Sequence, residues 1–132
     1  VVAGIRNWAR PDQLTGADLP PYSAAAGDAA RGESAYGEYC ARCHGADGEG
    51  GPNGGSVVDD SYLALVSDQS LRTSVISGRT DLGMPDWRGY VAGKPMDHQA
   101  ISDVVAWLAS SRVQFPGRPY PEADGEPGKQ GM

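Results

Sequence analysis

Apolar residues recur at helical spacing in two long stretches of the chain. The first follows Asp28, which can cap a helix that runs toward Cys40 with Glu33 and Glu38 on its solvent side. The second follows Asp97, and Met96 and Ile101 flank that start as a hydrophobic staple does. Its buried stripe would consist of Val104, Val105, Trp107 and Leu108, with Arg112 suited to the helix end.

Two shorter helices are expected between these stretches. Asp59 or Asp60 can cap a segment that continues to Val66, and Ser67 can start a second helix that Gly78 ends. The apolar residues of the second helix are Leu71, Val75 and Ile76. The pattern therefore predicts an all-α domain of about four short helices.

The two ends of the chain have a different composition from the middle. We expect residues 1–27 to be an extended arm or linker, although scattered apolar groups would let it wrap on the domain or on a partner. Residues 113–132 return to proline, glycine and charge, and read as a tail. The predicted domain is residues 28–112. The arm holds three helix-breaking prolines, Pro11, Pro20 and Pro21.

Composition limits the classes of protein that remain. A chain of 132 residues with 19 glycines, 10 prolines and one phenylalanine has a thin protein core, which a buried cofactor would complete. The net charge of −6 argues against nucleic acid and membrane lipid as partners. No apolar run is long enough to span a membrane, and no signal peptide is recognisable, so we expect a processed or trimmed product.

Cys40, Cys43 and His44 form the motif C-x-x-C-H. Two thiols one helical turn apart can add to the two vinyl groups of a haem, and the adjacent imidazole can then ligate the iron, which is the attachment signature of c-type haem. A zinc site would need a fourth ligand, for which the chain offers only His98. A redox dithiol would need a βαβ setting that the pattern does not indicate.

A glycine-rich loop, residues 45–55, follows this motif. Such a loop can fold beneath a haem and offer a backbone carbonyl to the second nitrogen of His44, and Pro52 or a neighbour is the candidate. The alternative is a plain flexible loop. The loop lacks the Lys-Ser/Thr ending that a phosphate cradle requires.

Met84 stands between Gly83 and Pro85 in an irregular stretch, residues 79–93. The small residue before it and the restricted one after it allow its thioether to be held inward, as the second axial ligand of an iron opposite a histidine. Trp87 is a candidate aromatic at the cofactor's rim, with plain packing as the alternative.

On these residues the stretch from Asp28 to Arg112 resembles the class I monohaem cytochromes c of the short bacterial type. The matching helix positions are Gly32 and Tyr36 on the first helix and Val104 and Trp107 on the last. The resemblance implies the cytochrome c fold, one covalent haem c, and iron ligated by His44 and Met84. It implies that the first and last helices cross at the glycine. The chain departs from mitochondrial members because Lys94 is the domain's single lysine.

The resemblance implies one-electron transfer between Fe(II) and Fe(III) in a respiratory or photosynthetic chain, and no enzyme activity of the chain's own. We expect redox protein partners or a membrane oxidoreductase complex, and a periplasmic or other extracytoplasmic location, with membrane association through a partner or a removed anchor. We expect no small-molecule substrate. The alternative is a haem enzyme or a gas or redox sensor with a displaceable sixth ligand, since Arg79 and Arg88 flank Met84. A second histidine ligand, His98, is also conceivable.

Overall fold

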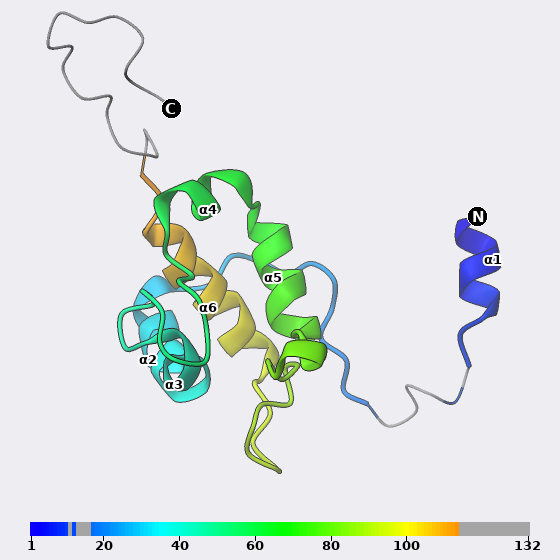
Figure 1. Cartoon of the computed structure of the whole chain (residues 1–132). Coiled ribbons are helices and arrows are strands. Elements are labelled where there is room, and N and C mark those ends of the chain that lie inside the picture. Colours follow the sequence, from blue (N-terminus) through cyan, green and yellow to red (C-terminus); the bar gives the residue numbers. More distant parts are fainter. Residues whose placement is uncertain (11, 13–16, 114–132) are drawn as a thin grey trace, which may run out of the picture.

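The computed structural model describes residues 1–10, 12 and 17–113, and in these residues it contains helices and no strand (Figure 1). The prediction of an all-α fold is confirmed. The elements are α1 (Val2–Asn7), α2 (Ala29–Tyr39), α3 (Ala41–His44), α4 (Asp60–Leu65), α5 (Asp68–Ser77), the 3-10 helix η1 (Thr80–Leu82) and α6 (His98–Ser110).

The predicted helix starts are confirmed by their caps. At each of four starts, a side-chain oxygen accepts a hydrogen bond from the backbone N–H three residues on, which satisfies one of the free amides of the first turn. The pairs are Asp28 with Arg31, Asp59 with Tyr62, Ser67 with Ser70, and Asp97 with Ala100. Gly78 ends α5 with a positive φ of 62°, as the sequence predicts.

The crossing of α2 and α6 is the most extensive contact between two helices of the domain. A Cβ atom added to Gly32 would lie 1.9 Å from the carbonyl oxygen of Asp103 and 2.8 Å from Cβ of Trp107. Only glycine therefore fits at this point of the crossing. One turn further along α2, the ring of Tyr36 lies over that of Trp107 with centroids 4.2 Å apart. The expected helix crossing is confirmed by these contacts.

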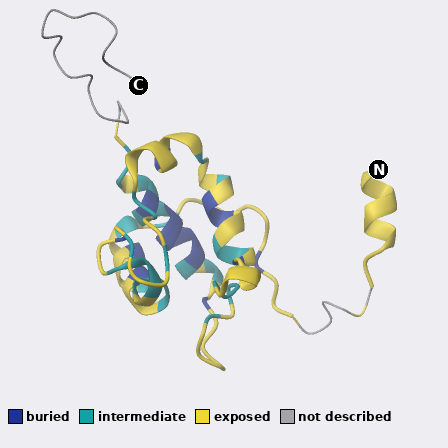
Figure 2. Cartoon of the chain, viewed as in Figure 1, coloured by how far each residue is buried: buried dark blue, intermediate teal, exposed yellow. Residues whose placement is uncertain are grey.

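The buried core follows α6 and the faces of α2, α4 and α5 that touch it (Figure 2). Its members are Tyr36, Leu63, Leu71, Met96, Ile101, Val104, Val105 and Leu108. Burial of Met96 and Ile101 in one cluster is what the hydrophobic staple predicts, so Met96 has a packing role. A core of eight apolar side chains is small for a domain of this length.

Part of the N-terminal arm lies along α5. The buried guanidinium of Arg72 donates from Nε and Nη2 to the carbonyl oxygen of Pro21, at 3.1 and 2.9 Å, and Gln69 donates to that of Tyr22 at 2.8 Å. At the other end of the domain, Arg112 donates to the carbonyls of Leu63 and Val66. These bonds hold the arm against α5, and Arg112, just after α6, against α4 and its C-terminal cap.

The arm also differs from the expectation that it is extended throughout. Residues 2–7 form α1, a stretch that contains no proline and is therefore free to be helical. The tail expected over residues 113–132 lies outside the described residues, apart from Val113. Within the part of the chain that the structure describes, no helix is both long enough and apolar enough to cross a bilayer.

Candidate functional site

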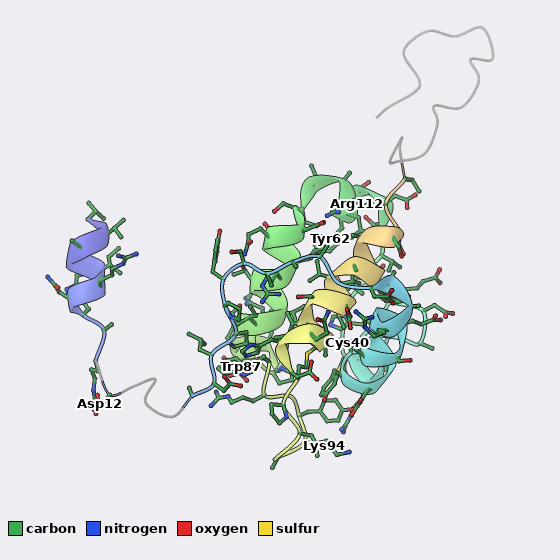
Figure 3. All side chains as sticks on the ribbon, turned by 180° about the vertical axis from the view of Figure 1, so that it is seen from behind. Asp12, Cys40, Tyr62, Trp87, Lys94 and Arg112 are labelled. Carbon is green, nitrogen blue, oxygen red and sulfur yellow. The ribbon has the colours of Figure 1, made fainter. Side chains whose placement is uncertain are left out.

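The two cysteines lie at the junction of α2 and α3 (Figure 3). Cys40 ends α2, and its carbonyl oxygen accepts hydrogen bonds from the amides of both Cys43 and His44 at 3.1 Å. This single turn places the thiols and the imidazole together. Both cysteines are free and half-buried.

Burial raises the pKa of the Cys40 thiol to about 11, and the nearby charge of Cys43 adds to that rise. A free thiol of this kind stays protonated at neutral pH, whereas catalytic dithiols need a lowered pKa. The raised pKa of Cys40 therefore argues against disulfide exchange.

The imidazole of His44 is held by the glycine-rich loop. Its Nδ1 lies 2.7 Å from the carbonyl oxygen of Gly55. Because a carbonyl oxygen only accepts, Nδ1 must carry the hydrogen, and Nε2 is left with the lone pair that a metal needs. The expectation that this loop offers a carbonyl to His44 is matched by this contact.

The acceptor is Gly55, however, and not Pro52. Gly51 donates to the carbonyl of Gly54 at 2.9 Å, which closes a turn with exposed Pro52 at its tip. Gly55, one residue after this turn, then brings the backbone back to the imidazole of His44. A Cβ atom on Gly54 would lie 3.0 Å from Nδ1 of His44, so the backbone here is packed directly against the imidazole.

The loop that carries Met84 is fixed by its backbone. Arg79 and Met84 exchange two backbone hydrogen bonds of 3.0 Å, and Gly83 takes the left-handed conformation between them. A Cβ atom on Gly78 would lie 2.3 Å from the carbonyl oxygen of Pro85. Met84 is half-buried on this rigid loop, which the sequence places correctly in an irregular stretch.

Trp87 lies near the end of α5 (Figure 3). Its amide donates to the carbonyl of Ile76 at 3.0 Å, and its carbonyl accepts from Met96 at 2.8 Å. The half-buried ring packs against the core, and the guanidinium of Arg88 lies 5.3 Å from its centroid. Trp87 thus links the Met84 loop to the start of α6.

Other candidate ligands are engaged elsewhere. Nε2 of His98 lies 3.6 Å from the carboxylate of Asp18 in the arm. Arg79 pairs with Asp81, and both side chains are more than half exposed. Arg88 pairs in the same way with Asp86, two residues before it.

The donors present suit a haem. Two thiols on one turn could attach a porphyrin covalently, and the imidazole of His44 and the separate thioether of Met84 could ligate its iron. The described residues contain no group of three or more His, Cys, Asp or Glu that could hold a bare metal ion. Half-buried apolar side chains adjoin the core and could pack on a macrocycle: Val57, Val58, Val66, Val75, Ile76 and Trp87.

A comparison with known families gives a match over most of the domain. The family model described as "Cytochrome C oxidase, cbb3-type, subunit III" matches residues 27–108. No curated protein and no solved structure matches the chain. The matched region begins one residue before the cap of α2 and ends near the end of α6.

Proposed function

The chain belongs to the cytochrome c family of cbb3-type oxidase subunit III, and we propose that Cys40 and Cys43 attach its haem c while His44 and Met84 ligate the iron. The function of this family is one-electron transfer in a respiratory chain, and the chain is an electron-transfer protein related to an oxidase subunit. When bound, haem c supplies a reversible Fe(II)/Fe(III) couple.

The contact between Nδ1 of His44 and the carbonyl oxygen of Gly55 is the observation that carries the proposal. With Nδ1–H on the carbonyl of Gly55, the ring cannot rotate without losing a 2.7 Å hydrogen bond, and Nε2 is ready to donate its lone pair. The turn at Cys40 keeps this ring within one helical turn of both thiols. Attachment and ligation are thus performed by adjacent residues of one short segment.

Met84 is the proposed second ligand because its loop leaves it little freedom. The paired bonds to Arg79 and the close approach of Gly78 restrict the backbone on both sides of the thioether. A thioether ligand from Met84 would raise the reduction potential of the haem. Ligation of the iron by both His44 and Met84 would leave no place for a substrate to bind, as an electron carrier requires.

The enzyme and sensor alternative finds no support in the two arginines of this loop. Distal chemistry on peroxide would need a free Arg or His, but Arg79 and Arg88 are each ion-paired to an aspartate two residues away. Their guanidinium groups are held on the surface by Asp81 and Asp86.

We further propose that residues 28–112 act as the haem domain of a membrane oxidoreductase complex on the extracytoplasmic side. The relation to an oxidase subunit supports this assignment over that of a freely diffusing carrier. Trp87 is proposed to pack on the macrocycle, because its ring links the Met84 loop to the core. Recovery of the protein with a membrane oxidase on mild solubilisation tests the assignment to a complex, and recovery in the soluble fraction alone contradicts it.

The ligand proposal is tested by a matched pair of substitutions in the holoprotein. Met84→Leu should abolish the weak long-wavelength band of methionine-ligated ferric haem and make the reduced protein bind carbon monoxide rapidly. Met96→Leu keeps an apolar side chain in the core and should change neither property. Carbon monoxide binding by the unmodified protein, or a band that survives Met84→Leu, would show that Met84 is not the ligand.

A further inference from the structure

The N-terminal segment, residues 1–10, is helical yet uncovered. Backbone hydrogen bonds continue α1 by a turn, from Trp8 to Ile5 and from Ala9 to Arg6, each 3.1 Å long. No residue of α1 is buried, and its ribbon is coloured as exposed throughout (Figure 2). Trp8 is 81% exposed and Ile5 53%, which is unusual for the two largest apolar side chains of a helix.

Five of the six apolar side chains of this segment share one face, and the sixth, Ala3, lies on the opposite side. At about 100° per residue, these five fall within an arc of roughly 120°, with Arg6 directly beside the arc and Arg10 about 80° beyond its edge. The apolar set is Val1, Val2, Ile5, Trp8 and Ala9. Arg6 and Arg10 provide the charge, with Asn7 on the opposite face.

The charge of the segment opposes that of the rest of the chain. Residues 1–10 carry Arg6 and Arg10 and no acid, whereas residues 11–132 carry nine Lys or Arg against 17 Asp or Glu. The nearest acid, Asp12, lies 3.9 Å from Arg10, and both side chains are at least 75% exposed, so this pair neutralises little. The net charge argued against lipid for the chain as a whole, but its distribution reverses that argument for this segment.

We propose that residues 1–10 bind the surface of an anionic lipid bilayer. The apolar face would enter the boundary between headgroups and acyl chains, with the ring of Trp8 at headgroup level and both arginines on lipid phosphates. The acidic domain would be repelled from the same surface, so the segment would act as a tether rather than as part of a flat contact. The proposal is independent of the proposed ligands and of electron transfer.

A lipid surface is favoured over a second copy of the chain by the size of the face. Five side chains on two turns cannot bury the roughly 800 Å² per partner that a stable protein interface needs. Reversible binding to a bilayer needs only a few apolar side chains together with attraction to anionic lipid. The segment satisfies both requirements.

Sedimentation of the holoprotein of residues 1–132 with lipid vesicles tests the proposal. The protein should pellet with vesicles that contain phosphatidylglycerol and much less with pure phosphatidylcholine, and salt should weaken the binding. Ile5→Asp and Trp8→Ala should each lower the partition coefficient at least about fivefold. Replacing Arg6 and Arg10 by glutamine should lower it about fivefold per arginine, on the phosphatidylglycerol vesicles only.

Asn7→Ala is the matched control, because it alters the polar face of the same helix. It should change the partition coefficient less than about twofold. The proposal is overturned if the unmodified protein stays in the supernatant, or if Ile5→Asp pellets as well as the unmodified protein. It is equally overturned if light scattering shows a dimer that Ile5→Asp dissociates while no variant binds vesicles.

Discussion

The two sides of the proposed haem site are built differently. On the side of His44, the bonds that hold the ligand segment come from residues close to it in the sequence. They run from the turn at Cys40 to the carbonyl of Gly55, and Tyr36 and Val57 add bonds to the carbonyls of Gly45 and Gly48 at 2.6 and 2.8 Å. On the side of Met84, the loop is held by contacts to the end of α5 and to the residues that precede α6. The first side is a local structure, and the second depends on the packing of the domain.

This difference predicts which side of the site should lose its structure first when the protein is destabilised. A ligand fixed by its own turn stays in place while distant helices loosen, since local contacts survive partial opening of the structure. The Met84 loop loses its position once α5 and α6 separate. We therefore expect the Met84 side to open before the His44 side, and the following substitutions test that order.

The largest effect is expected for His44→Ala. This change removes the proposed ligand from the local side, so the protein should lose nearly all correctly ligated haem and most of its helix content. His98→Ala is the control, because the His98 ring lies beside the exposed Asp18 of the arm, so its loss should leave both properties unchanged. Haem content and far-UV circular dichroism measure the result. A normal visible spectrum in His44→Ala would contradict the assignment.

Gly78→Ala should open the Met84 side selectively. The added Cβ meets the carbonyl of Pro85 at 2.3 Å and the φ of 62° is strained for alanine, for a cost of roughly 2–4 kcal/mol. The methionine band should therefore melt at a lower temperature than the helices do. Gly83→Ala has a positive φ but open space around its Cβ, and should cost only about 1–2 kcal/mol. Joint melting of band and helices in Gly78→Ala would rule out the expected order.

Gly32→Ala should weaken the crossing of α2 and α6. Its Cβ would lie 1.9 Å from the backbone of Asp103, so α2 and α6 must separate at a cost of about 1–3 kcal/mol in the free energy of unfolding. Gly37→Ala, in the same helix, meets no atom within 4 Å and should stabilise α2 by about 0.5–1 kcal/mol. Denaturant unfolding measures both. Equal and small effects would mean that the crossing is looser than described.

The smallest effect concerns the ion pair beside this crossing. The hydrogen bond from Arg31 lowers the pKa of Asp103 to about 2, although burial of this carboxylate acts to raise it, and Asp28 and Gln99 donate further bonds. Because the pKa of Asp103 is lower in the folded state, its ionised carboxylate stabilises the protein at pH values above the unfolded value of 3.8. This stabilisation is lost as the pH falls toward 2. Because Arg31 is well exposed, we expect a contribution on the order of 1 kcal/mol.

Asp103→Asn should remove this dependence. Its stability at pH 6 should be lower than that of the unmodified protein, and the two should converge as the pH falls to about 2. Urea unfolding at several pH values measures the difference. Parallel stability curves for the two proteins would show that Asp103 is not the group that titrates.

Local signals in the sequence predicted much of this structure. Each capping residue acts within three positions, so the starts of α2, α4, α5 and α6 were readable from Asp28, Asp59, Ser67 and Asp97. The C-x-x-C-H motif is equally local, since one turn contains all of its donors. The helix crossing was readable only through the resemblance, which marks Gly32.

Features that depend on loop closure or on distant contacts could not be predicted from the sequence. A run of glycines indicates a tight loop, but which carbonyl meets His44 depends on the turn that Gly51 and Gly54 close, so Pro52 was the wrong acceptor. The hydrogen bond from Arg72 to the arm joins residues 51 positions apart, and no periodic pattern in the sequence predicts such a contact. The sequence did not predict α1, because the expectation of an extended arm was based on prolines that all lie after this helix.

The central claim is that haem is attached through the segment that begins at Cys40. A mass spectrum of the purified holoprotein under denaturing conditions, followed by proteolysis, tests it most directly. We predict that the intact chain retains the mass of one haem and that the haem stays on the peptide containing Cys40, Cys43 and His44. A denatured chain with the mass of the polypeptide alone, or haem on any other peptide, would contradict the account.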